Sequence, residues 1–347
     1  MIMRTTCLIL SVSAIIISAL LAGTAGASPV TAGENERCVT VTDDLGGTVV
    51  IQGTPQRIVS LAPSNTEILY ALGLEDRIVG VTDCCDYPLA AADKPKVGGF
   101  ITGNVERVLA AEPDLVFASR NTEDVASRLR TLGMTVVILN PQTVDGVLRD
   151  IELAGKVTGQ EAQASACVEE LQQRIQAVIG MVENQTERPS VAHIVWYDPL
   201  WVSGRGTFQD EVITMAGGTN AFGSVEEWSI VSLEEFITSD PDYILVSSGS
   251  GMNRDGYDAV YNYVISEPRL QGLSAVRNNH VYVVDADVVS RGSPRIVDAL
   301  EEVAGDLHPD LFGTGTPKAA ETVQSPGIGV LSLICALSAA ILLWKRG

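Results

Sequence analysis

Histidine and cysteine, which often hold metals or act as base and nucleophile, are few in this chain. The three histidines stand at positions 193, 280 and 308, and no Gly-x-Ser-x-Gly motif offers a nucleophile with a base beside it. The adjacent pair Cys84 and Cys85 lacks the Cys-x-x-Cys spacing of redox and zinc sites. We therefore expect a protein that is not an enzyme and that binds its ligand without a resident metal or cofactor.

Two glutamates, Glu67 and Glu211, occupy equivalent places in a repeated pattern. Each lies six residues before a glycine, and the residues between are mostly apolar. A longer motif occurs at 105–119 and again at 233–247, with apolar residues and a Pro-Asp pair matched in position. This duplication predicts two related lobes. Lobes with separate cores meet along a crevice, and crevices between domains are where small ligands usually bind.

The elements that must position these motifs alternate between short strands and helices, which is typical of α/β domains with a largely parallel sheet. Cys38 to Ile51 is expected to form a hairpin, and Glu161 to Val182 has the apolar spacing of one long helix. We predict an α/β fold of two similar Rossmann-like lobes joined by that helix, with the ligand cleft between them. The expected segments are an N-terminal extension with the hairpin at 28–56, the first lobe at 57–141, the helical link at 142–187 and the second lobe at 188–312.

The two ends of the chain have the composition of targeting signals. Residues 1–27 combine a basic residue, an apolar stretch and a small-residue cleavage site, which is the pattern of a secretory signal peptide. A retained N-terminal anchor is the alternative. Residues 328–347 hold a charge-free apolar run followed by Lys345 and Arg346, so we expect a transmembrane or sorting segment with its basic end in the cytoplasm. The small and polar residues at 313–327 are expected to form a flexible stalk.

Ser325-Pro326-Gly327, beside this apolar run, resembles the archaeal PGF-type C-terminal sorting signal, although Ile328 replaces its phenylalanine. Whether the tail is cleaved stays open, and a buried core helix is the alternative to a membrane segment. We predict a body tethered through its C-terminus to the extracellular face of the cell membrane.

The chain is strongly acidic, with a formal net charge of −20 at pH 7. Nucleic acid and anionic lipid surfaces are therefore poor partners for it. Asn184-Gln185-Thr186 is a glycosylation sequon. The exported body holds four cysteines that permit three complete disulfide pairings, among which the sequence does not choose: Cys38, Cys84, Cys85 and Cys167.

Several stretches together resemble the vitamin B12-binding proteins of ABC importers, within the superfamily that also binds siderophores and haem. The resemblance covers residues 57–307. The stretches that carry it lie at 57–73, 79–88, 97–100, 112–116, 203–212, 217–222, 228–232 and 291–296. It implies two α/β lobes joined by a long helix, a ligand held between them, and delivery of that ligand to a membrane permease.

The resemblance also implies roles for individual residues. Those that match cleft-facing positions are Tyr87, Phe100, Trp196, Trp201, Trp228, Asp287 and Arg291. A corrinoid is a broad, mostly apolar disc fringed by amides, so aromatic walls and a few donors suit it; core packing is the alternative for each aromatic. Glu67 and Glu211 are expected to dock onto arginines of the permease, and capping of their own helices is the alternative.

We therefore predict a monomeric cell-surface protein that captures cobalamin or a related corrinoid and delivers it to an ABC permease. A ferric siderophore or haem binder of the same fold is the main rival. The chain lacks the evident nucleophile and base that a secreted hydrolase would need. An adhesive role would not explain two lobes with paired glutamates.

Overall fold

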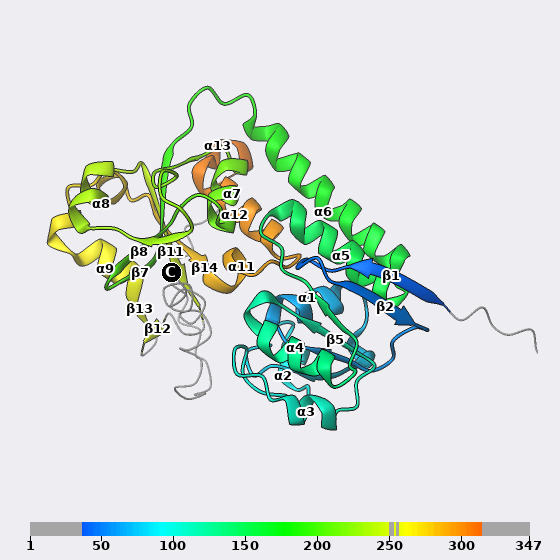
Figure 1. Cartoon of the computed structure of the whole chain (residues 1–347). Helices are drawn as coiled ribbons and strands as arrows, with labels where there is room; N and C mark the ends of the chain where they lie inside the picture. The colour runs from blue at the N-terminus through cyan, green and yellow to red at the C-terminus, as the bar shows by residue number, and fades with distance from the viewer. Residues whose placement is uncertain (1–36, 250–252, 255–256, 314–347) are drawn as a thin grey trace, which may run out of the picture. The chain divides into compact units, whose positions relative to one another are not determined.

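The computed structural model describes residues 37–249, 253–254 and 257–313 (Figure 1). The predicted signal peptide, the C-terminal apolar segment and all but the first residue of the predicted stalk lie outside them. Within the described part of the chain, no helix is long and apolar enough to cross a membrane.

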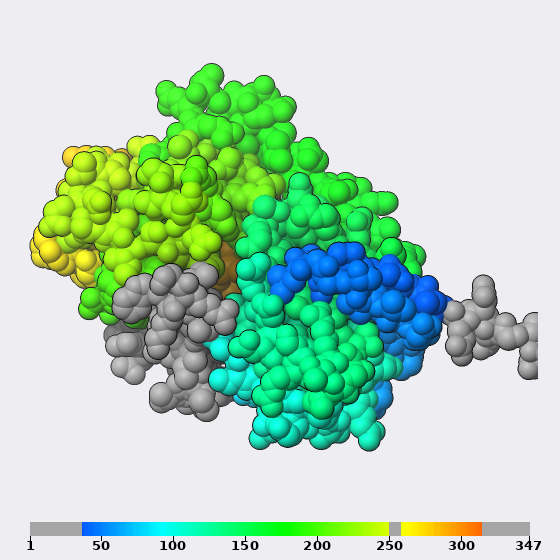
Figure 2. All heavy atoms as spheres, viewed as in Figure 1, coloured from blue at the N-terminus to red at the C-terminus, as the bar shows by residue number. Residues whose placement is uncertain are grey.

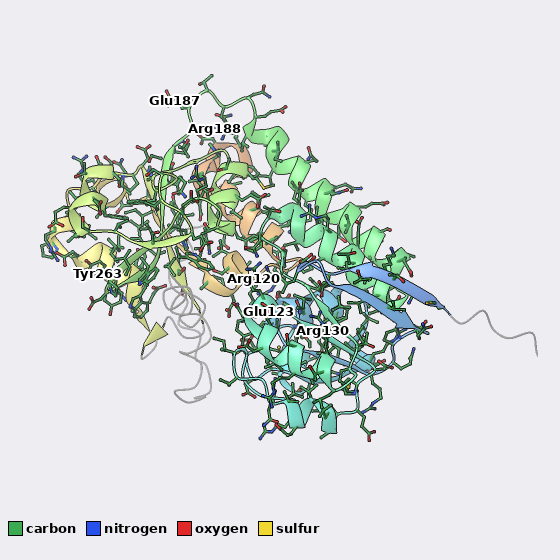
Figure 3. The ribbon with its side chains drawn as sticks, in the orientation of Figure 1. Arg120, Glu123, Arg130, Glu187, Arg188 and Tyr263 are labelled. Carbon is green, nitrogen blue, oxygen red and sulfur yellow. The ribbon has the colours of Figure 1, made fainter. Side chains whose placement is uncertain are left out.

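An antiparallel hairpin opens the described chain. Strands β1 (Cys38–Thr42) and β2 (Thr48–Gln52) pair from Cys38 opposite Gln52 to Thr42 opposite Thr48, which confirms the predicted hairpin. The buried Asp43 closes the turn, because its Oδ1 accepts hydrogen bonds from two backbone N–H groups of the turn. Its Oδ2 pairs at 2.6 Å with Arg130 (Figure 3), so the hairpin is fastened to the first lobe. Figure 2 shows the hairpin, in blue, lying against that lobe.

The first lobe contains a four-stranded parallel sheet in the order β4-β3-β5-β6. Alternate strand residues face opposite sides: Leu115 and Phe117 point into one apolar cluster, whereas Val116 and Ala118 point into another. Both faces are therefore covered, as parallel sheets require. The strands are β3 (Ile58–Ser60), β4 (Ile78–Val81), β5 (Leu115–Ala118) and β6 (Val136–Ile138), and the helices are α1 (Pro63–Ala71), α2 (Leu89–Ala92), α3 (Val105–Ala110) and α4 (Glu123–Thr131).

Two helices link the lobes. Helix α6 (Glu161–Val182) has the predicted bounds of the long helix, and α5 (Val144–Thr158) precedes it. Only two residues separate them, so they form a helical hairpin and lie side by side (Figure 1). The link is therefore a pair of helices, of which α6 is the long one.

The second lobe has a mixed six-stranded sheet in which β7, β11 and β14 run parallel, while β8 and β10 run antiparallel to their neighbours. The parallel strands of the second lobe follow the same order of strands and helices as the first lobe, as predicted. The antiparallel strands β8 and β10 have no counterpart in the first lobe, and the sequence repeat did not predict them. The strands are β7 (Ser190–Tyr197), β8 (Leu200–Ser203), β9 (Thr219–Asn220), β10 (Trp228–Ile230), β11 (Tyr243–Ser248), β12 (Asn253–Arg254), β13 (Tyr257–Asp258) and β14 (Val281–Asp285). The helices are α7 (Phe208–Met215), α8 (Leu233–Ser239), α9 (Ala259–Ser266), α10 (Ser274–Arg277), α11 (Ala286–Ser290), α12 (Ile296–Leu307) and α13 (Pro309–Phe312).

One buried apolar cluster joins the two sheets. Phe117 of the first sheet and Leu245 of the second belong to it, and buried residues of α5, α6 and α12 connect them. Separate clusters cover only the opposite faces of the two sheets. The expectation of two separate cores is therefore wrong, because the linking helices pack against both lobes at once.

The repeated motifs have structural roles that explain their spacing. Gly73 and Gly217 each come right after the C-cap residue of a helix. Their φ angles are +67° and +84°, the left-handed conformation that ends helices and that glycine adopts without strain. The aspartates of the two Pro-Asp pairs also act alike. Asp114 accepts hydrogen bonds from the backbone of Gln56 and Arg57 just before β3, and Asp242 accepts one from Ser190 at the start of β7.

Candidate ligand-binding site

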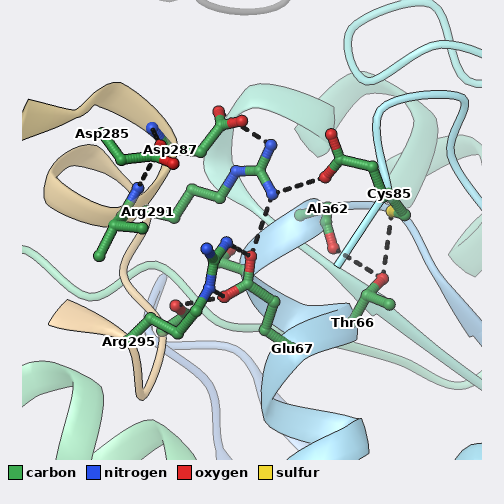
Figure 4. A network of polar contacts seen from close by, with 12 residues as sticks. Ala62, Thr66, Glu67, Cys85, Asp285, Asp287, Arg291 and Arg295 are labelled. Carbon is green, nitrogen blue, oxygen red and sulfur yellow. Dashed lines mark hydrogen bonds and ion pairs between the residues drawn. The ribbon is translucent and has the colours of Figure 1, made fainter. Parts of the chain in front are cut away.

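The carboxyl ends of parallel strands in both sheets lead into the predicted binding residues. In the first lobe Glu67 lies in the helix after β3, and Tyr87 lies in the loop after β4. In the second lobe Asp287 and Arg291 follow β14. Ligands of open α/β sheets bind outside the carboxyl ends of the strands. The structure brings these segments of both lobes together in one polar network (Figure 4).

Glu67 is at the centre of this network. Its Oε1 accepts from Arg291 Nη1 at 3.0 Å and from Arg295 Nη2 at 2.7 Å, and its Oε2 accepts from Arg295 Nε at 2.9 Å and from Ser293 Oγ at 2.6 Å. The side chain is only 2% exposed. The expectation that Glu67 points outward toward a permease is therefore corrected, because its carboxylate is enclosed by residues of the second lobe. Nor does it cap its own helix, since α1 begins after Ala62 without a side-chain cap.

Arg291 is held by three carboxylates. Its Nη1 also donates to Asp86 Oδ1 at 2.9 Å, and its Nη2 lies 2.9 Å from Asp287 Oδ1. Burial disfavours the charged guanidinium, but the neighbouring carboxylates outweigh burial and raise the pKa of Arg291. Burial raises the pKa of the Asp287 carboxyl despite the arginine beside it. Arg291 and Asp287 are therefore paired with each other, and their role in ligand binding stays a prediction.

Glu211, of the second lobe, contacts the linking helix α5. Its Oε2 accepts a hydrogen bond at 2.8 Å from the backbone N–H of Val144, the first residue of α5. Burial raises the pKa of this carboxyl, and the Val144 hydrogen bond opposes the shift. Glu211 thus caps a helix other than its own, and the expected capping of α7 is supplied by Thr207 instead.

The aromatic residues of the first lobe lie in loops. Tyr87 is 46% exposed, and its ring lies under the guanidinium of Arg295, whose Cζ is 3.8 Å from the ring centroid. This cation–π contact places Tyr87 at the edge of the network. Phe100 is partly exposed and belongs to none of the three buried apolar clusters, so its predicted role in the cleft stays a prediction.

The three predicted tryptophans of the second lobe occupy neighbouring strands with different degrees of burial. Trp196 is 8% exposed and lies in the outer apolar cluster, with its Nε1 donating to the Asp198 carbonyl at 3.1 Å, so it packs the core. Trp201 is paired with Trp196 across the β7–β8 ladder and remains partly exposed at the carboxyl edge of β7. Trp228 is also partly exposed, but its Nε1 is buried and has no hydrogen-bond partner among the described residues.

The histidines do not form a site with these residues. His193 Nδ1 lies 2.8 Å from Ser203 Oγ and its Nε2 lies 3.1 Å from Ser247 Oγ, which resembles a nucleophile and base. All three side chains are enclosed in the sheet, and burial lowers the pKa of His193 to about 3. A substrate cannot reach them. Within the described ranges, no group of three or more His, Cys, Asp or Glu side chains is arranged to hold a metal ion.

The structure also limits the disulfide pairings that the four cysteines of the body can form. Cys38, Cys85 and Cys167 carry free thiols, so no disulfide joins any two of the four cysteines of the body. Cys85 is buried, and Thr66 and Thr82 lie 3.1 and 3.0 Å from its sulfur. Burial raises the pKa of the Cys85 thiol. This cysteine therefore packs the loop that carries Tyr87 against Thr66 of α1.

The predicted binding residues did not include Asp86, Ser293 or Arg295. Arg295 immediately precedes α12, and its guanidinium binds Glu67. Asp86 stands next to Tyr87, and Ser293 lies between the two arginines, so adjacency to predicted residues was the one available signal. The sequence predicted that the lobes meet, but no local pattern in it indicates that Glu67 pairs with Arg291 and Arg295.

Comparisons with known proteins agree with this architecture. The family model described as periplasmic binding protein matches residues 58–288. An ABC transporter substrate-binding lipoprotein of Bacillus subtilis, YvrC, is 32% identical over 286 residues, which cover 79% of this chain and 87% of that protein. The vitamin B12-binding protein of Vibrio cholerae is 30% identical over 256 residues, which cover 72% of this chain and 87% of that protein.

A haem-binding relative has the same fold. The crystal structure of a periplasmic haem-binding protein from Pseudomonas aeruginosa superposes with a TM-score of 0.66 at 26% identity, covering 74% of this chain and 94% of that one. Relatives described by different ligands therefore lie at similar distances from this sequence. The chain belongs to the periplasmic binding protein family and is a substrate-binding protein of ABC transport.

Proposed function

We propose that this protein captures cobalamin or a related corrinoid outside the cell and delivers it to an ABC permease. The observation that carries the proposal is that both lobes meet at the carboxyl ends of the strands, where Tyr87 of the first lobe contacts Arg295 of the second, and Asp287 pairs with Arg291. The resemblance to vitamin B12-binding proteins picked out Tyr87, Asp287 and Arg291. Similarity to the Vibrio cholerae protein supports the choice of ligand.

Exposed apolar side chains near these strand ends support a large, mostly apolar ligand. Leu89 and Tyr87 follow β4 in the first lobe and are 83% and 46% exposed. Ile230 is 56% exposed and lies opposite Trp201 at the same edge of the second sheet. Covering water-exposed apolar groups with an apolar disc lowers the free energy of binding. A haem or ferric siderophore would also cover them, so these two ligands form the alternative.

Titration of the purified full chain tests the proposal. We expect saturable one-to-one binding of cyanocobalamin by calorimetry, together with a shift in the visible absorbance of the corrin. Leu89→Ala should weaken binding several-fold, whereas Leu132→Ala, another exposed leucine of the first lobe, should not. Absence of corrinoid binding together with tight haemin or ferric siderophore binding would reject the corrinoid and keep the transport role.

For docking onto the permease we propose Glu106 and Glu234 in place of Glu67 and Glu211. Docking on a two-fold permease calls for one exposed carboxylate at the same place on each lobe. The duplicated motif supplies such a pair in Glu106 and Glu234, each in the first turn of its helix and each exposed. Glu67 and Glu211 are occupied by internal contacts. Charged contacts of this kind set orientation and encounter rate.

We also propose that the protein is monomeric and is tethered through its C-terminus on the extracellular face of the membrane. The sequence patterns of residues 1–27 and 328–347 are the basis for its location. Protease digestion of intact cells should release the body. Protection of the body in intact cells, with digestion only after lysis, would contradict this location.

A further inference from the structure

The two arginines of the network are already neutralised by carboxylates of this chain. Arg291 contacts Glu67, Asp86 and Asp287, and Arg295 binds Glu67 through two nitrogens. The network therefore contains two guanidinium groups and three carboxylates, an excess of one negative charge.

Neighbouring groups do not remove this excess. The carboxylate of Asp285 is committed to the backbone of α11, where its Oδ1 accepts from the N–H groups of Asp287 and Val288. Lys96 lies behind the Tyr87 loop, and its Nζ donates to the carbonyls of Cys85 and Ala91.

One further cation lies on the carboxyl edge of the first sheet. Arg120 follows β5, and it is exposed to solvent. Two exposed carboxylates, Glu123 and Asp124, follow it in the first turn of α4, and Figure 3 shows Arg120 and Glu123 on the same segment. Water and salt screen exposed charges far more than enclosed ones. The enclosed members of the network, Glu67 and Arg291, are therefore screened less than Arg120 and its two carboxylates.

We propose that this network makes the site select neutral over anionic macrocycles, and that Asp86 is a specificity-determining residue. The proposal rests on the proposed function and narrows it to a ligand fringed by amides. A neutral amide can accept a hydrogen bond from Arg291 without adding charge. A carboxylate at the same place meets an arginine whose charge is already balanced, and the surplus negative charge repels it.

Asp86 is the carboxylate best placed for this role. It is 47% exposed, whereas Glu67 is 2% exposed and serves the contact between the lobes. Asp287 belongs to the same short segment as Arg291 and is four residues from it. Replacing Asp86 with Asn therefore removes one charge from the ligand side of Arg291 and leaves the Glu67 contacts in place.

The test compares two ligands that differ by a single charge. Cyanocobalamin and its monocarboxylic acid derivative, in which one side-chain amide is hydrolysed, are titrated into the full chain at low and high salt. We expect the acid to bind at least tenfold more weakly at low salt, with a smaller difference at high salt. Asp86→Asn should reduce the difference at least threefold, mainly by tightening the binding of the acid. Asp124→Asn, a matched charge removal on an exposed helix turn, should leave the difference unchanged.

A second pair of ligands separates this inference from the proposed function. Haemin and its dimethyl ester differ by two carboxylates on a porphyrin. If the chain binds porphyrins but no corrinoid, the proposed ligand is wrong, and a preference for the ester would still support charge selection. Equal affinity within either bound pair, or a preference for the acid, would overturn the inference. Failure to bind any of the four would overturn both proposals.

Discussion

Glu67 and Arg295 form a two-point ion pair between residues 228 positions apart, with nitrogen to oxygen distances of 2.7 and 2.9 Å. The parallel N–H···O bonds of such a pair fix orientation as well as distance. The carboxylate is enclosed, so its charge depends on these partners for stabilisation. This pair is a direct polar contact between α1 of the first lobe and the start of α12 in the second.

Glu67→Gln should therefore destabilise the fold. The substitution leaves Arg291 and Arg295 with one carboxylate fewer in a half-buried place, and breaking a buried pair typically costs about 3 kcal/mol. We expect a lower free energy of unfolding in urea denaturation. Glu301→Gln is the control, because Glu301 binds Arg174 through two oxygens but is 42% exposed, and exposed pairs contribute about 1 kcal/mol or less. Similar losses in the two variants would contradict the structural role of Glu67.

The docking proposal predicts loss of uptake without loss of binding. Glu106→Arg combined with Glu234→Arg reverses the charge at both equivalent positions, so arginines on a permease would repel the lobes. We expect uptake of labelled ligand by cells to fall at least tenfold, while ligand affinity and thermal stability stay near those of the original protein. Glu187→Arg, at an exposed position between α6 and β7, is the control (Figure 3). Normal uptake by the double variant would rule out these two glutamates.

The unpartnered indole of Trp228 predicts an effect on binding. Its buried Nε1 has no partner among the described residues, so removing this donor should not destabilise the free protein. If a ligand amide accepts from it, Trp228→Phe should weaken binding about tenfold, as loss of a hydrogen bond worth about 1.4 kcal/mol would. Trp196→Phe should lower the stability of the free protein and leave ligand binding unchanged, because it loses the hydrogen bond to the Asp198 carbonyl inside the core. Calorimetry and thermal denaturation of both variants separate the two effects.

Asp150 predicts a specific pH dependence of stability. Burial and the neighbouring carboxylate Asp44 raise the pKa of this α5 side chain from 3.8 to about 9. The folded state thus holds a proton that the unfolded chain releases near pH 4. Its contribution to stability is fully present below about pH 4 and is lost as pH rises toward 9.

Asp150→Asn keeps a neutral group at this place at every pH. The variant should become increasingly stable relative to the original protein between pH 5 and pH 9, by about 1 kcal/mol or more at the upper end. Using the difference between the two proteins cancels the titration of other groups, such as Asp306, whose pKa burial raises to about 7. A difference in unfolding free energy that is the same at both ends of the range would contradict the raised pKa.

The sequence by itself determined the parts of this protein that depend on local patterns. The hairpin, the α6 helix and the repeated strand and helix pairs follow from apolar periodicity and turn residues, which act over a few positions. The duplicated glycine and Pro-Asp pairs were visible for the same reason, since each serves a helix end or a strand start beside it. The resemblance to a known family picked out Tyr87, Asp287 and Arg291. In the fold, Asp287 pairs with Arg291, and Tyr87 contacts Arg295 nearby in the same network.

Only the tertiary structure decided how the paired glutamates and the tryptophans are used. Glu67 looks like an exposed helix-start residue in the sequence, but Arg291 and Arg295 reach it from the other lobe. Trp196 and Trp201 are the same residue type and lie close together in the sequence, yet sheet packing buries the first and leaves the second partly exposed. Burial and ion pairing depend on which distant segments meet, and that is set by the packing of whole elements, which the local order of residues does not record.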